Sequence, residues 1–310
     1  MADYKILFVR SGNHGQSPIT AYQGASLKKV GVDVLYFDIK GKGFFGYLHN
    51  LFRLRKCIKT AKPELIHAHY SFSGFLAALT FCGKPVVISL MGSDVKSDRK
   101  FRFLIYIFYH LFWAKTIVKS ADMQHVLGLK NVMVIPNGVD LDLFFEMDKI
   151  EARKKLNWPS EERIVLFASD PNRPEKNFNL AKEAIRLADS SIKIMYLNGV
   201  DPEQVNYYYN AADVVLLTSL WEGSPNVVKE AMACNRPIIT TNVGDVSWVI
   251  GKTSGCYVTN FDATVISERI KYCLDHITKS EGNTRILDLK LDSISIAKRI
   301  LEVYYQVTSK

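Results

Sequence analysis

The sequence predicts an α/β protein with two domains, each a doubly wound parallel sheet covered by helices. Short apolar runs of strand length alternate with segments of helical periodicity along nearly the whole chain, and this alternation is typical of parallel sheets. The chain has 310 residues, 48% of them hydrophobic, which is enough for two cores of ordinary size. No low-complexity tract interrupts the pattern, so we expect the whole chain to fold.

The first half of the chain alternates predicted strands with predicted helices. The strands are expected at 5–9, 32–37, 65–69, 85–90, 115–119 and 132–135. The helices are expected up to about Val30, near 47–61 and from Ser73 onward. A turn at 136–140 follows the last of these strands.

A second alternation follows a charged helix expected at 148–156. Its strands are expected at 163–168, 193–197, 213–217, 238–241 and 256–259. Its helices are expected at 178–188, near 202–211, from Asn226 onward and at 245–250. A last helix is expected at about 293–308, because its apolar residues recur with helical spacing.

The net charge of +9 is unevenly distributed. Residues 1–140 contain 19 Lys and Arg against 8 Asp and Glu, a balance of +11, whereas the remainder contains 21 against 23, a balance of −2. The basic residues gather with aromatic residues at 40–56 and 99–115. Either these segments are core with a solvated charged face, or they form a surface for an anionic membrane. The charge would also suit nucleic acid, but no nucleic-acid-binding motif is present, so no such partner is expected.

The cysteines and the N-terminal sequence predict a cytoplasmic location. The five cysteines form no Cys-x-x-Cys pair, which predicts reduced, mostly buried thiols in a cytoplasmic protein. The sequence begins directly with a strand, so no signal peptide is expected. The longest apolar run, 103–113, is too short to span a bilayer.

The segment TSLWEGSPNVVKEAMACNRP at 218–237 is the most informative for function. A buried strand ends at Leu217, a turn follows, and a helix begins at Asn226. The first amides of that helix, around Asn226 and Val227, lack intrahelical acceptors and lie at the positive end of the helix dipole. They therefore suit a diphosphate.

Two carboxylates flank this helix start. Glu222 lies in the turn and Glu230 is eight residues later, so both can face a ligand at the mouth of the helix. Carboxylates accept hydrogen bonds from hydroxyls, and Gly223 allows a close approach of the backbone. A diphosphate with polyhydroxyl groups on both sides is a nucleotide sugar.

In this setting the two glutamates resemble the signature of the retaining, nucleotide-sugar-dependent glycosyltransferases of family 4, which have the two-domain GT-B fold. Other matches stand in the family's order: IHAHY at 66–70, SLMGSD at 89–94, VIPNGVD at 134–140, RPEKN at 173–177, AAD at 211–213 and PIITTNVG at 237–244. The resemblance implies an acceptor-side domain at 1–138, a donor domain at 139–292, and a C-terminal helix, 293–310, packed back on the first domain.

The resemblance also implies roles for single residues. Glu230 would bind the ribose hydroxyls, and Glu222 would contact the donor sugar as a catalytic residue. Arg173 and Lys176 would neutralise the diphosphate and the charge that grows on the leaving phosphate. The remaining donor-binding residues would be Gly223, Ser224, Pro225, Asn226, Val227, Gly12 and Gly15. Asp213 is expected to have a structural role at its strand.

The chain departs from the family in three places. Family members commonly have a histidine, bonded to the donor sugar, where this chain has Met91. Either backbone groups of Met91 and Gly92 replace it, or catalysis is weaker, or the chain is a variant. Asp94 either orders this loop or binds acceptor hydroxyls, and His69 either approaches the acceptor or is structural. Arg173 lies closer to Lys176 than the family's arginine does. The family's additional strand between residues 197 and 213 is missing.

The leading prediction is a retaining glycosyltransferase of the hexosyltransferase type. It would move a sugar from a nucleotide diphosphosugar to a hydroxyl of a glycan or lipid-linked glycan in cell-surface polysaccharide synthesis. The resemblance implies neither a metal nor another cofactor. The protein would be cytoplasmic, with a peripheral position on the inner face of the membrane as a further expectation. Two alternatives remain: a nucleotide-sugar-binding subunit without catalysis, and a GT-B nucleotide-sugar epimerase. A dehydrogenase is disfavoured because Gly12 and Gly15 lack the dinucleotide spacing.

Overall fold

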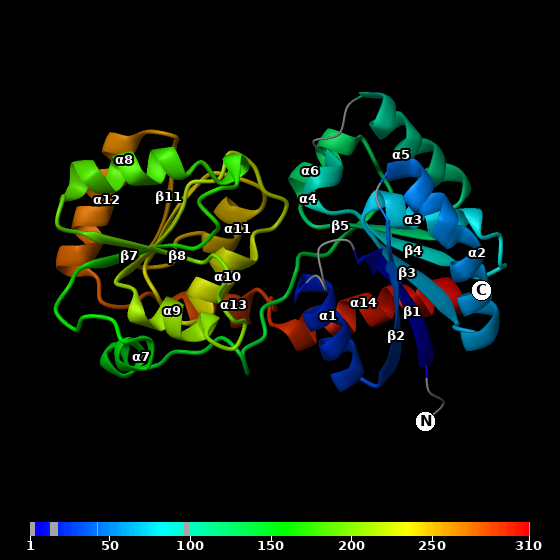
Figure 1. Ribbon diagram of the computed structural model, residues 1–310, viewed down its shortest axis with the longest axis horizontal. Coiled ribbons are helices and arrows are strands. Elements are labelled where there is room, and N and C mark those ends of the chain that lie inside the picture. The colour runs from blue at the N-terminus through cyan, green and yellow to red at the C-terminus, as the bar shows by residue number, and fades with distance from the viewer. Residues whose placement is uncertain (1–3, 13–17, 42, 96–98, 310) are drawn as a thin grey trace. The chain divides into compact units, whose positions relative to one another are not determined.

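The computed structural model describes residues 4–12, 18–41, 43–95 and 99–309. The chain divides into two compact units, each with one parallel sheet (Figure 1). Unit 1 comprises Met1–Gly138 and Ser293–Lys310, and unit 2 comprises Val139–Asp292. The predicted class, two doubly wound parallel α/β domains, is confirmed.

Unit 1 contains a six-stranded sheet in the order β2-β1-β3-β4-β5-β6. All its pairs are parallel. The strands are β1 (Tyr4–Ser11), β2 (Val32–Ile39), β3 (Leu65–His69), β4 (Val86–Ser89), β5 (Lys115–Val118) and β6 (Met133–Val134). Residues 6–9 of β1 are fully buried, as expected for a central strand covered on both faces.

Seven helices cover this sheet in the described part of unit 1. They are α1 (Pro18–Lys29), α2 (Gly43–Ala61), α3 (Ser71–Leu79), α4 (Gly92–Val95), α5 (Arg99–Leu111), α6 (Ala121–Leu127) and α14 (Ser293–Thr308). Helix α2 packs against α3, and α14 packs against α1. The ring of Phe75 in α3 lies 4.5 Å from that of Phe108 in α5 and 5.7 Å from that of Trp113. These aromatic contacts fix α3 and α5 side by side over the apolar face of the sheet.

Unit 2 contains a five-stranded parallel sheet in the order β11-β10-β9-β7-β8. Its strands are β7 (Ile164–Phe167), β8 (Lys193–Tyr196), β9 (Val214–Leu217), β10 (Ile238–Thr241) and β11 (Cys256–Thr259). Its helices are α7 (Lys149–Leu156), the short 3-10 helix η1 (Pro174–Lys176), α8 (Phe178–Ala188), α9 (Val205–Ala211), α10 (Asn226–Ala233), α11 (Val246–Ile250), α12 (Ala263–His276) and α13 (Gly282–Asp288).

Asp213 has the predicted structural role. Its carboxylate accepts hydrogen bonds from Lys149 at 2.7 Å, from the buried Arg153 at 2.8 Å and from the amide of Ile164 at 2.7 Å. These contacts join α7 to the starts of β7 and β9. Because Arg153 is buried, removing Asp213 would leave the guanidinium inside unit 2 without its carboxylate partner.

Two helices of unit 2 were not predicted from the sequence. Helix α12 begins after Asp262, whose carboxylate caps the amides of Thr264 and Val265 at 2.8 and 3.3 Å. It buries Ile266 and Ile270, one helical turn apart. Helix α13 follows it. In the described residues, no helix is both long and apolar enough to cross a membrane.

Candidate active site

The two loops that follow β7 and β9 meet at the carboxyl edge of the unit 2 sheet. Lys176 ends η1 after β7, and its ammonium contacts Oε1 of Glu222 in the loop after β9. Ser219 donates a hydrogen bond of 2.8 Å to the same oxygen. Lys176 is only 8% exposed. The structure therefore brings these two predicted site residues together.

Further contacts hold the two loops in place. The hydroxyl of Thr218 donates to the carbonyl oxygens of Lys176 and Asn177, at 3.0 and 2.9 Å. The amide of Leu220 donates to the carbonyl oxygen of Glu175 at 2.9 Å. Hydrogen bonds from both sides thus fix the backbone around Lys176, and such support gives a preorganised site.

Arg173 does not join the Lys176–Glu222 pair. Its guanidinium is paired with Oε1 of Glu175, with Nε at 2.8 Å and Nη2 at 2.5 Å, and its side chain is 54% exposed. The predicted role of Arg173 at the diphosphate therefore requires its side chain to leave Glu175, which an exposed ion pair permits at little cost.

The turn at 223–225 delivers the chain to α10. Pro225 precedes the helix, and no side chain caps its first amides. Gly244 lies against this turn with φ of +57°, and a Cβ there would lie 2.5 Å from the carbonyl oxygen of Gly223. Only glycine allows this close approach. Oδ1 of Asn226 is buried and has no hydrogen-bond partner. The uncapped amides at Asn226 and Val227 suit an anion.

Glu230 is held by a residue that was not predicted. Tyr209 in α9 donates a hydrogen bond of 2.6 Å to Oε2 of Glu230. Burial raises the pKa of Glu230, while this hydrogen bond and the nearby Lys229 lower it. Tyr209 and Glu230 are far apart in the sequence, and only the fold brings α9 beside α10, so no local signal identifies the pair.

Hydrogen bonds among buried polar and charged side chains support the turn at 223–225. Lys229 donates a hydrogen bond of 2.6 Å to Oγ of Ser224, and Ser224 donates one of 2.6 Å to Oδ2 of Asp245. Lys229 is 1% exposed. Burial lowers the pKa of Lys229, whereas Asp245, Glu230 and Glu222 raise it. Neither Lys229 nor Asp245 was predicted from the sequence.

The predicted acceptor-side residues of unit 1 follow β3 and β4. His69 ends β3, stacks on His67 with ring centroids 4.3 Å apart, and has a buried Nε2 without a hydrogen-bond partner. Burial lowers the pKa of His69 well below its usual range, and His67, Lys119 and Arg10 lower it further. The imidazole is therefore neutral at physiological pH, with one ring nitrogen left to bond a ligand.

Asp94 uses its carboxylate within the chain. It accepts hydrogen bonds from the amide and hydroxyl of Ser71, at 3.1 and 2.5 Å, and from the amide of Met91 at 2.5 Å. This arrangement favours the loop-ordering role for Asp94 over binding of acceptor hydroxyls. It also occupies the Met91 amide, so of the two backbone groups considered as replacements for the family's histidine, only that of Gly92, the first residue of α4, remains.

The glycines after β1 are partly described. The amide of Gly12 donates to the carbonyl oxygen of Ile39 at 2.8 Å. A Cβ at Gly12 would lie 2.9 Å from Cβ of Asp38, so this position favours glycine for packing alone. Gly15 lies outside the described residues.

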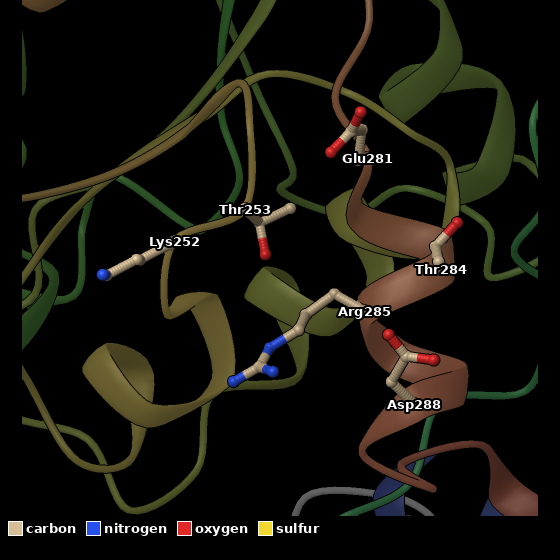
Figure 2. Close-up of a pocket in the computed structure, with 6 residues that line it drawn as sticks. All are labelled: Lys252, Thr253, Glu281, Thr284, Arg285 and Asp288. Atoms are coloured by element: carbon tan, nitrogen blue, oxygen red, sulfur yellow. The ribbon is translucent and has the colours of Figure 1, made fainter.

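A pocket of about 430 Å³ lies in unit 2 (Figure 2). Its lining residues are Lys252, Thr253, Glu281, Thr284, Arg285 and Asp288. Arg285 donates to the carbonyl oxygens of Trp248 and Val249, at 3.0 and 3.1 Å, and so closes the end of α11. None of the predicted site residues lines this pocket. The guanidinium of Arg285 already donates hydrogen bonds to the backbone of α11.

Neither the spacing nor the proximity of acidic residues indicates a metal site in the described residues. Asp140 and Asp142 have Asp-x-Asp spacing, but Oδ1 of Asp140 accepts the Asp142 amide at 3.0 Å and closes a turn. Within the described ranges, no three His, Cys, Asp or Glu side chains cluster closely enough to hold a metal ion. All five cysteines are free.

Comparisons with known proteins match both units. Residues 147–276 match the family described as Glycosyl transferases group 1, and residues 14–143 match Glycosyltransferase Family 4. TuaC of Bacillus subtilis, named for a glycosyltransferase of teichuronic acid biosynthesis, is 30% identical, with 79% of this chain and 71% of TuaC covered. An Escherichia coli UDP-Gal:alpha-D-GlcNAc-diphosphoundecaprenol alpha-1,3-galactosyltransferase is 25% identical, with 80% and 73% covered.

Solved structures show the same fold at lower identity. Sucrose-phosphate synthase from Thermosynechococcus elongatus superposes with a TM-score of 0.84 at 17% identity, covering 99% of both chains. Anabaena HepE, in complex with UDP and glucose, gives a TM-score of 0.78 at 16% identity, covering 98% of this chain and all of HepE.

Proposed function

Because this chain belongs to the family 4 glycosyltransferases, we propose that it transfers a sugar from a nucleotide diphosphosugar to an acceptor hydroxyl with retention at the anomeric carbon. The predicted family, its GT-B fold and the glycosyltransferase activity are confirmed by the matches above. One observation carries the finer proposal: the Lys176–Glu222 pair stands at the carboxyl edge of the unit 2 sheet, at the turn that leads into the uncapped start of α10.

Unit 2 binds the donor in this proposal. The amides at the start of α10 and the ammonium of Lys176 bind the diphosphate, and Arg173 joins them when it leaves Glu175. Tyr209 occupies Oε2 of Glu230, which leaves Oε1 to accept a hydrogen bond from a ribose hydroxyl. Glu222 accepts hydrogen bonds from the donor sugar.

The reaction breaks the bond between C1 of the sugar and the phosphate oxygen, whose electron pair stays on the phosphate. The acceptor oxygen bonds to C1 on the same face, and the acceptor proton goes to the departing phosphate. Lys176 stabilises the negative charge that grows on that phosphate. With cations and a helix dipole in this role, we expect activity without a divalent metal or another cofactor.

The names of similar proteins support a choice of substrates. HepE was solved with UDP and glucose, and the Escherichia coli relative is named for a UDP-Gal donor and a diphosphoundecaprenol-linked acceptor. We therefore propose a UDP-sugar donor and a lipid-linked glycan acceptor in cell-surface polysaccharide synthesis. Unit 1 supplies the acceptor contacts, with His69 as the candidate hydrogen-bonding group.

A lipid-linked acceptor calls for contact with a membrane surface, and unit 1 offers one. Exposed apolar side chains lie on α2, where Phe45 is 82% and Phe52 is 75% exposed, and on α5, where Phe103 and Leu111 are exposed. Buried residues of α5, such as Phe108, form core, as the first of the two alternatives for 99–115 expects. We propose that these exposed faces bind anionic membranes peripherally.

Donor turnover tests the proposal. The full chain is incubated with a panel of UDP-sugars and lipid-linked or truncated acceptors, with and without EDTA, and the anomeric configuration of the product is read by NMR. The expected result is an α-linked product from an α-linked donor, formed equally with EDTA, and formed about 100- to 1,000-fold more slowly by Lys176→Ala. Interconversion of the donor sugar without acceptor would indicate an epimerase. Tight UDP binding without any turnover would indicate a binding subunit.

A further inference from the structure

A basic pocket of about 450 Å³ lies at the amino edge of the unit 1 sheet. It is formed by the end of α2, just before β3, and by the loop between α3 and β4. Its lining residues are Arg55, Ile58, Lys59, Lys62, Phe81, Cys82 and Lys84. The predicted acceptor residues His69 and Met91 follow the opposite ends of the same two strands. The pocket therefore lies at the opposite edge of the sheet from these acceptor-side residues.

The charge in this pocket is not neutralised by the fold. Four of its seven lining residues are cations and none is a carboxylate. Nor does any carboxylate elsewhere in the described chain pair with Arg55, Lys59, Lys62 or Lys84. Four like charges around one cavity repel each other, and an anion in the cavity would relieve that repulsion. The floor is apolar, because Ile58 is buried there.

Two of the seven described non-glycine residues with positive φ line this pocket. Lys62 and Phe81 both have φ of +47°, a region that bulky residues rarely adopt. Phe81 nevertheless presents its ring to solvent, at 68% exposed. Strained residues of this kind cluster at ligand sites. Here the strain places an aromatic ring at the rim of a basic pocket.

Apolar side chains continue from the rim in two directions. The ring of Phe81 lies 6.3 Å from that of Phe112, beyond the end of α5, next to exposed Leu111. On α2, exposed Phe45, Leu48 and Phe52 precede Arg55 and Lys59 at helical spacing, so one exposed stripe runs from apolar to basic toward the pocket. A soluble phosphate would contact only the cations of the pocket. A lipid would contact the cations with its phosphate and the apolar rim with its acyl chains.

We propose that this pocket binds the phosphate of an anionic glycerophospholipid headgroup, with the phosphate among Lys59, Lys62 and Lys84 and the acyl region against Phe81 and Phe112. This inference rests on the proposed membrane contact and adds a specific site to it. Binding to a diffuse basic surface depends only on the charge density of the membrane. Binding in a pocket without carboxylates also depends on the chemistry of the lipid headgroup. Phosphatidylserine carries an ammonium that finds no carboxylate partner there, and a carboxylate that competes with its phosphate for the same cations. Phosphatidylglycerol adds only hydroxyl groups to its phosphate.

Vesicle binding of the full chain tests the proposal. Phosphatidylcholine vesicles contain equal fractions of either phosphatidylglycerol or phosphatidylserine, so their surface charge is the same. Wild type is expected to prefer phosphatidylglycerol. Lys59→Ala/Lys84→Ala should abolish that preference and weaken binding about fivefold per removed charge. The control Lys154→Ala/Lys155→Ala removes the same charge from exposed positions of α7 in unit 2 and should change neither result.

Several results would overturn the proposal. Equal binding of wild type to both lipids, or equal losses in the two double variants, would show diffuse electrostatics only. Displacement of the protein from phosphatidylglycerol vesicles by inorganic phosphate, but not by chloride at equal ionic strength, would show a free-phosphate site instead.

Turnover with a truncated, soluble acceptor is the separate readout for the proposed enzyme activity. It should be unchanged in Lys59→Ala/Lys84→Ala, because neither lysine is among the residues proposed to bind the donor or the acceptor. If wild type shows the lipid preference but no turnover, the lipid-binding pocket is supported and the proposed transfer reaction is contradicted.

Discussion

Tyr209 donates a hydrogen bond of 2.6 Å to Oε2 of Glu230 and so joins α9 to α10 within unit 2. Tyr209 is fully buried, and burial raises its pKa well above the usual value, as does the neighbouring Glu230. The phenol therefore remains a donor at any physiological pH. It fixes one oxygen of Glu230 within the chain. If Glu230 binds ribose as proposed, this lowers the cost of ordering the carboxylate on binding.

Glu230→Ala should weaken binding of UDP about 10- to 100-fold, because hydrogen bonds to a charged group contribute roughly 1.5–3 kcal/mol. Tyr209→Phe should weaken binding less, since the carboxylate remains but is no longer fixed. Calorimetric titration with UDP measures both. The double variant Glu230→Ala/Tyr209→Phe leaves no unpaired phenol and serves as the control for local disruption. Unchanged affinity in Glu230→Ala would remove this residue from the site.

The sequence predicted those parts of the site that are local in the chain. Glu222, Gly223 and the start of α10 follow one another through a strand, a turn and a helix, so their spacing is sufficient to place them. Tyr209 and Asp245 come from other segments, and only the packing of α9 and α11 around α10 brings them to Glu230 and Ser224. No periodicity in the sequence contains that information.

The partners of charged residues likewise could not be predicted from the sequence. Lys229 is buried and donates to Ser224, which donates to Asp245, yet a lysine in a helix is ordinarily expected at the surface. Arg173 lies in the expected loop, but its guanidinium pairs with Glu175, two residues along. Which carboxylate pairs with a given cation depends on side-chain geometry, which the sequence does not show. In contrast, Asp262 is a helix N-cap signal that is visible in the sequence, and α12 could have been predicted from it.

Lys176→Ala should lower kcat about 100- to 1,000-fold, the usual effect of removing one group that stabilises transition-state charge. KM for the donor should change much less. Arg173→Ala should cost less than Lys176→Ala, because its exposed side chain must first leave Glu175. Steady-state kinetics over donor concentration separates the two parameters. A raised KM with constant kcat in Lys176→Ala would contradict the role at the leaving phosphate.

Lys229→Met should destabilise the protein by about 3–5 kcal/mol, because it leaves Asp245 buried without its cation. Asp245 already has one buried oxygen, Oδ1, without a hydrogen bond. The double variant Lys229→Met/Asp245→Leu removes both charges and should be closer to wild type than the sum of the single variants. Denaturant unfolding of the four proteins gives the coupling energy. Additive effects would mean that Lys229 and Asp245 do not act as a pair.

Asp94 should make the stability of the protein depend on pH. Burial raises the pKa of Asp94 to about 6, although its hydrogen bonds from Ser71 and Met91 lower it. A carboxyl group with a raised folded pKa stabilises the fold below its unfolded pKa and loses that contribution as pH rises through 6. The expected loss between about pH 4 and 6 is about 3 kcal/mol.

Unfolding free energies of wild type and Asp94→Asn across this range measure the effect, because the variant lacks the titrating group. Their difference should change with pH only in this window. Ser71→Ala removes a hydrogen bond that favours the charged form, and should move the transition to higher pH. A difference that is constant with pH would show that Asp94 is charged throughout.

The final prediction is that the chain is a working transferase although Met91 stands where the family commonly has histidine. Unit 2 keeps Lys176, Glu222 and Glu230 in buried or half-buried positions with defined partners. Such groups are costly to retain without a ligand. The missing histidine removes one hydrogen bond to the donor sugar, about 1–3 kcal/mol, which is about one or two decades in rate.

The Met91 amide cannot repair this loss, because it already donates to Asp94 at 2.5 Å. Met91→His should therefore raise kcat, by up to the same one or two decades, whereas Glu222→Gln should lower it. Both variants are compared with wild type in donor turnover with a matched acceptor, and UDP binding is measured in parallel. If Met91→His gains turnover while wild type has none, the natural chain is a binding subunit whose lost activity depends on this one side chain. Measurable wild-type turnover that Met91→His does not increase would mean that the chain has another donor for the sugar hydroxyl, and the amide of Gly92 is then the first group to test.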